Sequence, residues 1–419
     1  MRIRVEGRAP LNGTYQPSGN ANAAQALLAA ALLTDQPVTL SNVPDTLSTQ
    51  GLLQLIESLG GHIERESDRL ILYPEQVSRR VLTQAETDAT LGMILLVAPM
   101  LIRCQHVRLE IDFPLNRIRT HLEALRDLGI DVINRDGAVE FKGVRWDKRE
   151  IVLLQASVTA TAMIMMMASR LGSRTIVHNA ACEPHIQELA HALVSMGARI
   201  EGIGSSVLTI FGTDELSGAA WTVPPDYIEA ASVAAICAMS GGRAQINGVG
   251  LREMRVIAKI FWSLGIQIDL DEQALYIPRH EVLTVSNREE DIDASIETAP
   301  WPGFPSDLVA IATVIATQAR GTSLIHEKMY NNRLLFVDKL KAMGAQIVLC
   351  DPHRAIVVGQ TPLRGIYMDS PDVRTGLGML GAALIADGES VIDNAQALEY
   401  TFSGALAKLT ALNAKITAE

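Results

Sequence analysis

One stretch of the sequence recurs six times, and this repetition restricts the possible folds more than any other feature. In its first copy, Leu52–Tyr73, apolar residues at helical spacing lead to a glycine, which is followed by two short apolar runs separated by polar residues. The later copies are His121–Gly143, Leu189–Gly212, Val256–Pro278, Phe336–Gly359 and a truncated last copy, Ala405–Glu419. A fixed period indicates a single supersecondary unit that is used repeatedly.

Each copy carries a glycine or an asparagine at the same place, just after its helical part. Neighbouring anchors lie 68 or 69 residues apart, except for one step of 79 residues. They are Gly60, Gly129, Gly197, Gly265, Gly344 and Asn413. Both residue types tolerate the left-handed backbone conformation that often ends a helix. The pattern therefore predicts a helix, a left-handed cap, a strand, a turn and a second strand in each copy.

A second element precedes each copy, namely a helix of small apolar residues followed by a strand. The six helices are expected at Asn22–Leu33, Leu91–Ile102, Ala160–Arg170, Ala230–Met239, Leu308–Ala319 and Gly376–Ala386. The strand after the second of them is expected at Val107–Asp112. Helices that are apolar on nearly all sides are usually buried. The full unit is predicted to be strand, buried helix, strand, amphipathic helix, strand and strand, present six times.

Length and composition set the remaining bounds. At 419 residues the chain exceeds one typical core, so we expect two domains of three repeats each. The net charge of −11 and the lack of a basic run argue against nucleic acid as a partner. We expect no membrane association and a cytoplasmic location, because the sequence has neither an apolar span nor a secretory signal. The four cysteines lie in separate repeats without metal-site spacing, so we expect reduced thiols, no metal and no cofactor.

The first buried helix has a polar start, at Ser18–Asn22. Backbone N–H groups that are unpaired at a helix N-terminus can bind anions. An ordinary capped helix would have the same sequence, so this feature alone leaves both alternatives open.

Several motifs make the chain resemble a known enzyme family. Its first 33 residues, MRIRVEGRAPLNGTYQPSGNANAAQALLAAALL, resemble the UDP-N-acetylglucosamine enolpyruvyl transferases of peptidoglycan synthesis, and less closely the shikimate-pathway enolpyruvyl transferases. Further matches are Thr298–Asp307 (TAPWPGFPSD), Asn179–Pro184 and the pair Asn332-Arg333, and the resemblance covers the whole chain. It implies an α/β fold, an inside-out barrel of two domains that close over the substrates. The domains would be residues 20–226 and residues 1–19 joined to 227–419.

The resemblance also implies a reaction and a set of site residues. In the family, an acceptor hydroxyl adds to phosphoenolpyruvate and phosphate is lost. Asp307 matches the catalytic carboxylate that faces the acceptor hydroxyl, although it could instead favour a helix N-terminus electrostatically. Arg374 could likewise pair with Asp372 rather than face the cleft. The implied substrate-binding positions are Asn22, Asn116, His121, Ser157, Val158, Arg333 and Arg374.

Other positions depart from the family pattern. The family lysine near the first helix is Ala21, and family arginines align with Leu91, Asn116 and Tyr400. The loop that carries the family's catalytic cysteine, or aspartate in some members, is absent between Arg103 and Asn116. Two hypotheses follow. The chain is a divergent enzyme acting on a small-molecule substrate, such as a UDP-sugar or another hydroxylated anionic ligand, with impaired or altered phosphoenolpyruvate chemistry. Alternatively, it is a non-catalytic ligand-binding or regulatory protein that keeps the fold.

Overall fold

The chain forms two compact units, each with its own hydrophobic core. The structure is a computed structural model that describes residues 1–89, 92–286, 295–369 and 375–419. Unit 1 comprises Met1–Ser18 and Pro225–Glu419, and unit 2 comprises Gly19–Pro224. Buried apolar side chains form one cluster in each unit. The boundaries that the family resemblance implies differ from these by no more than two residues. Whether each unit is a domain that folds alone stays a prediction.

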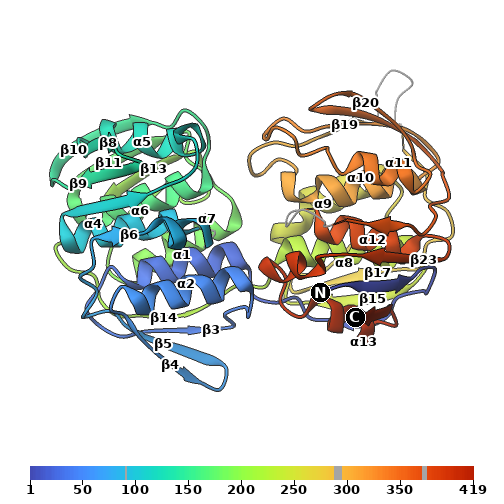
Figure 1. Cartoon of the computed structure of the whole chain (residues 1–419), viewed down its shortest axis with the longest axis horizontal. Coiled ribbons are helices and arrows are strands. Elements are labelled where there is room, and N and C mark those ends of the chain that lie inside the picture. Colours follow the sequence, from blue (N-terminus) through green and yellow to red (C-terminus); the bar gives the residue numbers. More distant parts are fainter. Residues whose placement is uncertain (90–91, 287–294, 370–374) are drawn as a thin grey trace. The chain divides into compact units, whose positions relative to one another are not determined.

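The centre of each unit is made of three helices with little polar surface. In unit 2 they are α1 (Ala21–Ala31), α4 (Val97–Cys104) and α6 (Val158–Leu171). In unit 1 they are α8 (Tyr227–Met239), α10 (Val309–Gln318) and α12 (Gly376–Ile385). Figure 1 shows α8, α10 and α12 side by side, with β19 and β20 on one side and β15 and β17 on the other. Such helices are buried because no face of them is polar enough to meet water.

Amphipathic helices cover the central ones. They are α2 (Leu47–Ser58), α5 (Arg119–Asp127), α7 (Pro184–Ser195), α9 (Leu251–Ser263), α11 (Val337–Ala342) and α13 (Ala405–Ala411). In α9 the buried residues are Met254, Ile257 and Phe261, which share one face at helical spacing. The shorter helices are α3 (Gln84–Ala89), η1 (Met93–Leu96), η2 (Leu115–Ile118), η3 (Ser306–Leu308) and η4 (Ala395–Tyr400). The expected helix Leu91–Ile102 is thus η1 followed by α4, and Leu91 lies outside the described residues.

The described strands form six four-stranded sheets, three in each unit. The sheets of unit 2, in spatial order, are β14 (Ala220–Thr222), β3 (Val38–Ser41), β5 (Arg69–Tyr73), β4 (His62–Glu66); β6 (Val81–Leu82), β7 (His106–Glu110), β9 (Ala138–Lys142), β8 (Asp131–Arg135); and β10 (Trp146–Val152), β11 (Gly172–His178), β13 (Val207–Phe211), β12 (Arg199–Glu201). Those of unit 1 are β2 (Asn12–Tyr15), β15 (Arg243–Asn247), β17 (Ala274–Ile277), β16 (Asp269–Leu270); β18 (Ser295–Glu297), β19 (Gly321–His326), β21 (Arg354–Gly359), β20 (Gln346–Asp351); and β22 (Tyr367–Met368), β23 (Glu389–Ile392), β1 (Ile3–Glu6), β24 (Lys415–Ala418).

All six sheets share one topology. The first two strands of each sheet are parallel, and the other pairings are antiparallel. Strand β1 supplies the third position of the last sheet, where Ile3 is opposite Ile392 on one side and Ala418 on the other. This explains why the sixth copy is truncated, since its missing strand comes from the start of the chain. The predicted fold of six such units is confirmed.

The repeat anchors have the backbone conformation that the sequence predicts. The φ angles of Gly60, Gly129, Gly197, Gly265 and Gly344 lie between 88° and 110°, and that of Asn413 is 80°. Most residues with a Cβ atom are strained there, and asparagine is among the few that adopt this conformation. The periodic glycines therefore mark helix ends, and their spacing fixes where each amphipathic helix gives way to a strand.

Two of these glycines allow a matched test of the caps. At Gly60 an added Cβ would lie 2.5 Å from the carbonyl oxygen of Gln76, whereas at Gly197 it would meet nothing within 4 Å. Both residues are in unit 2 and have φ angles of 105° and 110°. We expect Gly197→Ala to lower the free energy of unfolding by about 1–2 kcal/mol, from backbone strain alone. Gly60→Ala should lower it further, because the clash adds to the strain. Urea unfolding followed by circular dichroism measures both, and equal losses would contradict the steric account.

Candidate active site

The best-defined candidate group in unit 1 is an ion pair beside the start of α10. Asp307 lies in η3, directly before α10, and its Oδ1 atom accepts a hydrogen bond of 3.0 Å from Arg333. The Arg333 side chain is 6% exposed, whereas that of Asp307 is 43% exposed. The guanidinium also lies over the Tyr330 ring, 4.6 Å from its centre. A carboxylate held in this way can still accept a hydrogen bond from a ligand hydroxyl.

A second carboxyl group in unit 1 marks the start of α8. Asp226 caps this helix, and its Oδ1 atom accepts hydrogen bonds from the N–H groups of Ile228 (2.8 Å) and Glu229 (3.1 Å). Asp226 is 2% exposed. Burial raises the pKa of the Asp226 carboxyl to about 7, and the charge of Glu229 adds to the shift, while the backbone hydrogen bonds oppose it. Asp307 also raises this pKa, so the two carboxyl groups affect each other electrostatically.

Glu229 is the centre of a buried network in unit 1. It is fully buried and accepts hydrogen bonds from the Tyr15 hydroxyl (2.6 Å), the Ser18 N–H group (3.1 Å) and the Lys408 ammonium (3.1 Å). Burial, followed by the Glu229 charge, raises the pKa of Tyr15. The Ser18 carbonyl in turn accepts from the Asp226 N–H group at 2.7 Å. The network thus holds the two chain segments at which unit 1 ends, next to Gly19 and next to Pro224.

In unit 2, three of the predicted site residues lie around the start of α6. Ser157 caps this helix and accepts a hydrogen bond of 3.3 Å from the Ala160 N–H group, and Val158 is its first residue. The ring Nε2 atom of His121 lies 2.8 Å from the Thr159 hydroxyl, while the buried Nδ1 atom has no hydrogen-bond partner among the described residues. Burial lowers the pKa of His121 to about 4, although the Ile118 backbone opposes the shift. The ring is therefore neutral near pH 7.

Asn22 and Asn116 are both exposed, on α1 and η2 respectively. The expectation that the start of α1 has unpaired N–H groups is partly wrong, because the Asn20 side chain accepts from the Ala23 N–H group at 2.9 Å. The structure joins Asp307 to Arg333, and His121 to the Ser157–Thr159 turn. Within the described ranges, the side chains of Asn22 and Asn116 form no hydrogen bond with either group. Arg374 lies outside the described residues, and convergence of the full set stays a prediction.

The connection between β7 and η2 corrects one sequence-based prediction. The strand expected at Val107–Asp112 ends at Glu110. The Ile111 N–H group still donates to the Gly137 carbonyl, but Gly137 belongs to the turn that precedes β9, so the strand pairing stops there. Asp112 therefore lies in the connecting segment 111–114 and is exposed. Arg117 follows in η2 and is also exposed. The sequence analysis did not identify the Asp112 carboxyl group as a candidate. The signal was the Asp-Phe-Pro sequence, since a proline at 114 disfavours a continued strand.

The positions that depart from the family pattern are uncharged in the structure as well. Ala21 is the first residue of α1 and is buried. Tyr400 is the last residue of η4. Cys104 ends α4, and burial raises the pKa of its thiol. None of these residues can supply a cation, and Leu91 cannot be placed because it lies outside the described residues.

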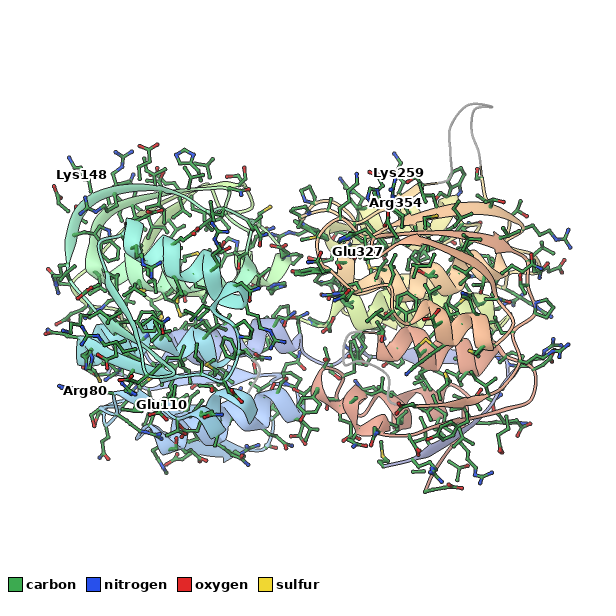
Figure 2. All side chains as sticks on the ribbon, turned by 45° about the horizontal axis from the view of Figure 1, so that its top comes forward. Arg80, Glu110, Lys148, Lys259, Glu327 and Arg354 are labelled. Carbon is green, nitrogen blue, oxygen red and sulfur yellow. The ribbon has the colours of Figure 1, made fainter. Side chains whose placement is uncertain are left out.

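The sequence analysis also passed over Glu327, which is fully buried at the end of β19 (Figure 2). Its carboxylate contacts both the segment that bears Asp307 and the segment that bears Arg333. The available signal was the repeat itself. Asn42 directly follows β3 and Asn179 directly follows β11, and Glu327 holds the corresponding place after β19.

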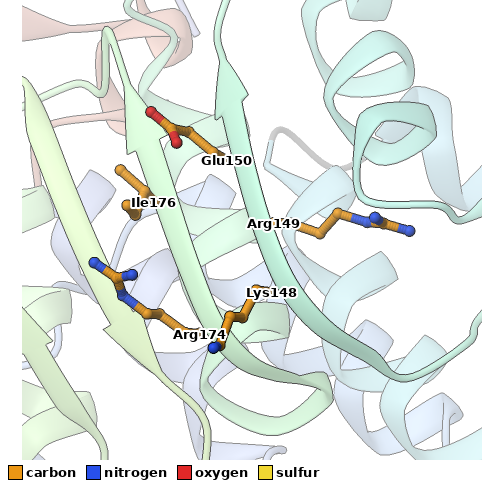
Figure 3. Close-up of a pocket in the computed structure, with 5 residues that line it drawn as sticks. All are labelled: Lys148, Arg149, Glu150, Arg174 and Ile176. Carbon is orange, nitrogen blue, oxygen red and sulfur yellow. The ribbon is translucent and has the colours of Figure 1, made fainter.

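A hollow of about 190 Å³ lies elsewhere, on the outer face of the β10–β11 sheet. Figure 3 shows Lys148, Glu150, Arg174 and Ile176 on one side of these strands and Arg149 on the other. No predicted site residue lines it. Across the described ranges no three His, Cys, Asp or Glu residues are grouped as a metal site would require. No described helix combines the length and the apolarity needed to cross a bilayer.

Comparisons with known proteins agree with this architecture. A sequence model of the family described as EPSP synthase (3-phosphoshikimate 1-carboxyvinyltransferase) matches residues 5–409. A UDP-N-acetylglucosamine 1-carboxyvinyltransferase of Treponema denticola is 40% identical to this chain, with 98% of each chain covered. A protein of the same name from Borrelia garinii is 38% identical, with 98% of this chain and 97% of that protein covered.

Two solved structures share the fold. The enolpyruvyl transferase NikO from Streptomyces tendae matches with a TM-score of 0.87 at 20% identity, covering 99% of this chain and 98% of that one. EPSP synthase from Acinetobacter baumannii matches with a TM-score of 0.76 at 16% identity over 100% of both chains. The fold class that the family resemblance implies is therefore confirmed.

The low pKa of His121 predicts a dependence of stability on pH. The unfolded chain, with the ordinary value of 6.5, binds the proton more tightly than the folded chain, with a value of about 4. The contribution to stability is therefore complete above pH 6.5 and is lost as the pH falls towards 4. By pH 5 we expect a loss of about 2 kcal/mol. His121→Asn should remove this part of the dependence. Thr159→Val should retain it, because burial rather than the hydroxyl causes the shift; urea unfolding at pH 7 and pH 5 compares the three proteins.

Asp226 predicts the opposite dependence. The pKa of Asp226 is about 7 in the folded chain, above the ordinary value of 3.8. The stability that this carboxyl group contributes is therefore complete below pH 3.8 and is lost as the pH rises through 7. Asparagine also caps helices but cannot ionise. The free energy of unfolding of Asp226→Asn minus that of the parent chain should therefore rise by on the order of 2 kcal/mol when the pH is raised from 5 to 8. Asp338→Asn, in the first turn of α11, serves as the exposed control. An unchanged difference between pH 5 and pH 8 would show that Asp226 is ionised throughout.

Proposed function

Because this chain belongs to the EPSP synthase (3-phosphoshikimate 1-carboxyvinyltransferase) family, we propose that it is a divergent enolpyruvyl transferase homologue with impaired or altered phosphoenolpyruvate chemistry. Its ligand is UDP-N-acetylglucosamine or another hydroxylated anionic molecule of that kind. The observation that carries the proposal is the ion pair of Asp307 with Arg333, which presents a half-exposed carboxylate beside the start of a buried helix. The names of the relatives support the nucleotide-sugar class of the ligand.

The acceptor side of the site is chemically plausible. The hydroxyl of the acceptor substrate needs a general base that takes up its proton as the oxygen attacks. Asp307 offers a carboxylate that Arg333 orients through Oδ1. The alternative is that Asp307 only favours the helix N-terminus electrostatically. That role needs no side-chain hydrogen bond, whereas Asp307 accepts one from Arg333.

The donor side lacks the cations that the family resemblance implies. The phosphate of phosphoenolpyruvate leaves as an anion, so its departure requires positive charges that are already directed at it. The implied positions are Ala21, Asn116 and Tyr400, none of which carries a charge. A hydrogen bond to a charged group contributes about 1.5–3 kcal/mol, so three lost contacts would weaken the bound anion by roughly 5–9 kcal/mol. That corresponds to about three to six orders of magnitude in affinity.

A second candidate function is binding without catalysis, either as a ligand-binding or as a regulatory protein. It is favoured by the short β7–η2 connection, in which only residues 111–114 remain where the resemblance implies a catalytic loop. The two candidates differ at Asp112. A transferase needs a group that donates a proton to the C3 carbon of the donor, and Asp112 is the one carboxyl group in this connection. A binding protein needs no such group.

Turnover can be tested against an active relative. With UDP-N-acetylglucosamine and phosphoenolpyruvate both at millimolar concentration, we expect phosphate release at least about a thousandfold slower than by the Treponema denticola relative, because the donor binds weakly when its cations are missing. UDP-N-acetylglucosamine alone should raise the melting temperature, because a ligand that binds only the folded state stabilises it. A rate within tenfold of the relative would refute the impaired chemistry.

Two variants separate the candidate functions. Asp112→Asn should abolish any residual phosphate release if the chain is a slow transferase, while Asp131→Asn, an exposed aspartate at the start of β8, should not change it. If the parent chain, Asp112→Asn and a no-enzyme control release phosphate equally while the ligand still raises the melting temperature, the binding function is correct.

A further inference from the structure

Glu327 is the most completely satisfied buried charge-bearing side chain near the candidate site. It directly follows β19 and is 0% exposed. Its Oε1 atom accepts hydrogen bonds from the Thr298 hydroxyl at 3.0 Å and from the N–H groups of Met329 (2.8 Å) and Tyr330 (3.0 Å). Its Oε2 atom accepts one of 2.6 Å from the Ser306 hydroxyl. A carboxylate is costly to bury, and four donors offset that cost.

These four donors belong to two separate chain segments. Thr298 and Ser306 stand at the two ends of the segment that leads into α10, and Ser306 is the immediate neighbour of Asp307. Met329 and Tyr330 belong to the turn that leads to Arg333. One carboxylate therefore fixes both segments whose next functional residues form the Asp307–Arg333 ion pair.

The contacts close into a ring. Glu327 holds Ser306, which is bonded covalently to Asp307, and Asp307 accepts from Arg333 at 3.0 Å. Arg333 lies over the ring of Tyr330, whose N–H group returns to Glu327. A second anchor fixes Glu327 itself, because its N–H group donates to the His353 carbonyl and its own carbonyl lies 2.8 Å from the His353 ring. The ion pair thus sits on a rigid support that continues into the β21 hairpin.

We propose that Glu327 is the positioning residue of this site: through Ser306 and the 329–330 turn it sets the separation and direction of Asp307 and Arg333. This inference rests on the proposed function, in that Asp307 contacts the ligand. It differs from a purely structural role in one respect. If Glu327 served only to satisfy the 329–330 turn, the hydroxyl of Ser306 would not be needed, and its loss would not reach Asp307.

The test removes the contacts of Glu327 by single substitutions. Ser306→Ala removes the contact to Oε2 and leaves the other three donors in place. Glu327→Gln is the conservative variant, because it keeps a side chain of the same shape. Its amide can donate to the Ser306 hydroxyl, which can rotate to accept that hydrogen bond. Ser323→Ala is the matched control, because Ser323 is buried in β19 of the same unit and its hydroxyl has no partner within the described residues. Each change is made in the parent chain and in Asp307→Asn.

The readouts are the dissociation constant for UDP-N-acetylglucosamine by titration calorimetry and the melting temperature. In the parent chain we expect Ser306→Ala to weaken binding about tenfold, as expected for one misdirected hydrogen bond to a charged group, Glu327→Gln to weaken it less, and Ser323→Ala to have no effect. In Asp307→Asn, Ser306→Ala should change the affinity less than about twofold, because the residue that it positions is already altered. Equal weakening in both backgrounds, or no weakening in either, would overturn the proposal.

A failure of the proposed function remains distinguishable. If the parent chain does not bind UDP-N-acetylglucosamine, or if Asp307→Asn binds it as well as the parent, the ligand assignment fails. The positioning role is then decided by stability alone. The melting-temperature shifts of Asp307→Asn and Arg333→Lys should be non-additive in the parent chain and close to additive in Ser306→Ala. Unchanged non-additivity in Ser306→Ala would show that Glu327 does not position the pair.

Discussion

Six helices without a polar face have to be covered on every side, and the rest of the structure follows from this requirement. In α8, every residue from Tyr227 to Ala238 is buried. Packing such helices together in threes, under sheets and amphipathic helices, removes their sides from water and leaves only their ends near the surface. Chemistry in this fold is therefore confined to helix ends and to the segments that lead into them. Asp226, Ser157 and Asp307 all stand at such places.

Covering the central helices also requires sheets that are complete, and the chain achieves this by sharing strands across large sequence distances. Strand β1 completes the sheet of the last repeat, and β14 completes that of the first. Both strands lie at the ends of their units, so each set of three repeats closes on itself. The Glu229 network lies where the chain leaves unit 1, and its full burial with three donors holds the segments on either side. Closure of the sheets and fixation of the crossing segments are thus parts of one arrangement.

The sequence predicts this fold well because its strongest signals are local. A glycine with φ near 105° at Gly60 follows from steric rules that concern one residue and its neighbours, and the period of the anchors then orders the rest. The site was less predictable, because its contacts join residues that are distant in sequence. Glu327 and Ser306 are 21 residues apart, and no periodic pattern announces their hydrogen bond. The end of β7 was misjudged for a similar reason, since β-propensity alone does not show where the partner strand stops.

The asymmetry of the Asp307–Arg333 pair bears on why it exists. A buried guanidinium without a partner is costly, so Arg333, whose side chain is 6% exposed, needs Asp307 for stability whether or not a ligand binds. Stability alone, however, would be served equally by a carboxylate buried beside it. Asp307 instead keeps 43% of its side chain exposed, and the exposed part can accept further hydrogen bonds. The guanidinium packs over the Tyr330 ring, and Glu327 holds the Asp307 segment through Ser306. Recognition of a hydroxyl requires a partly exposed carboxylate on a rigid support, as is found here. This support restricts more of the chain than a simple ion pair would, so it costs more conformational entropy.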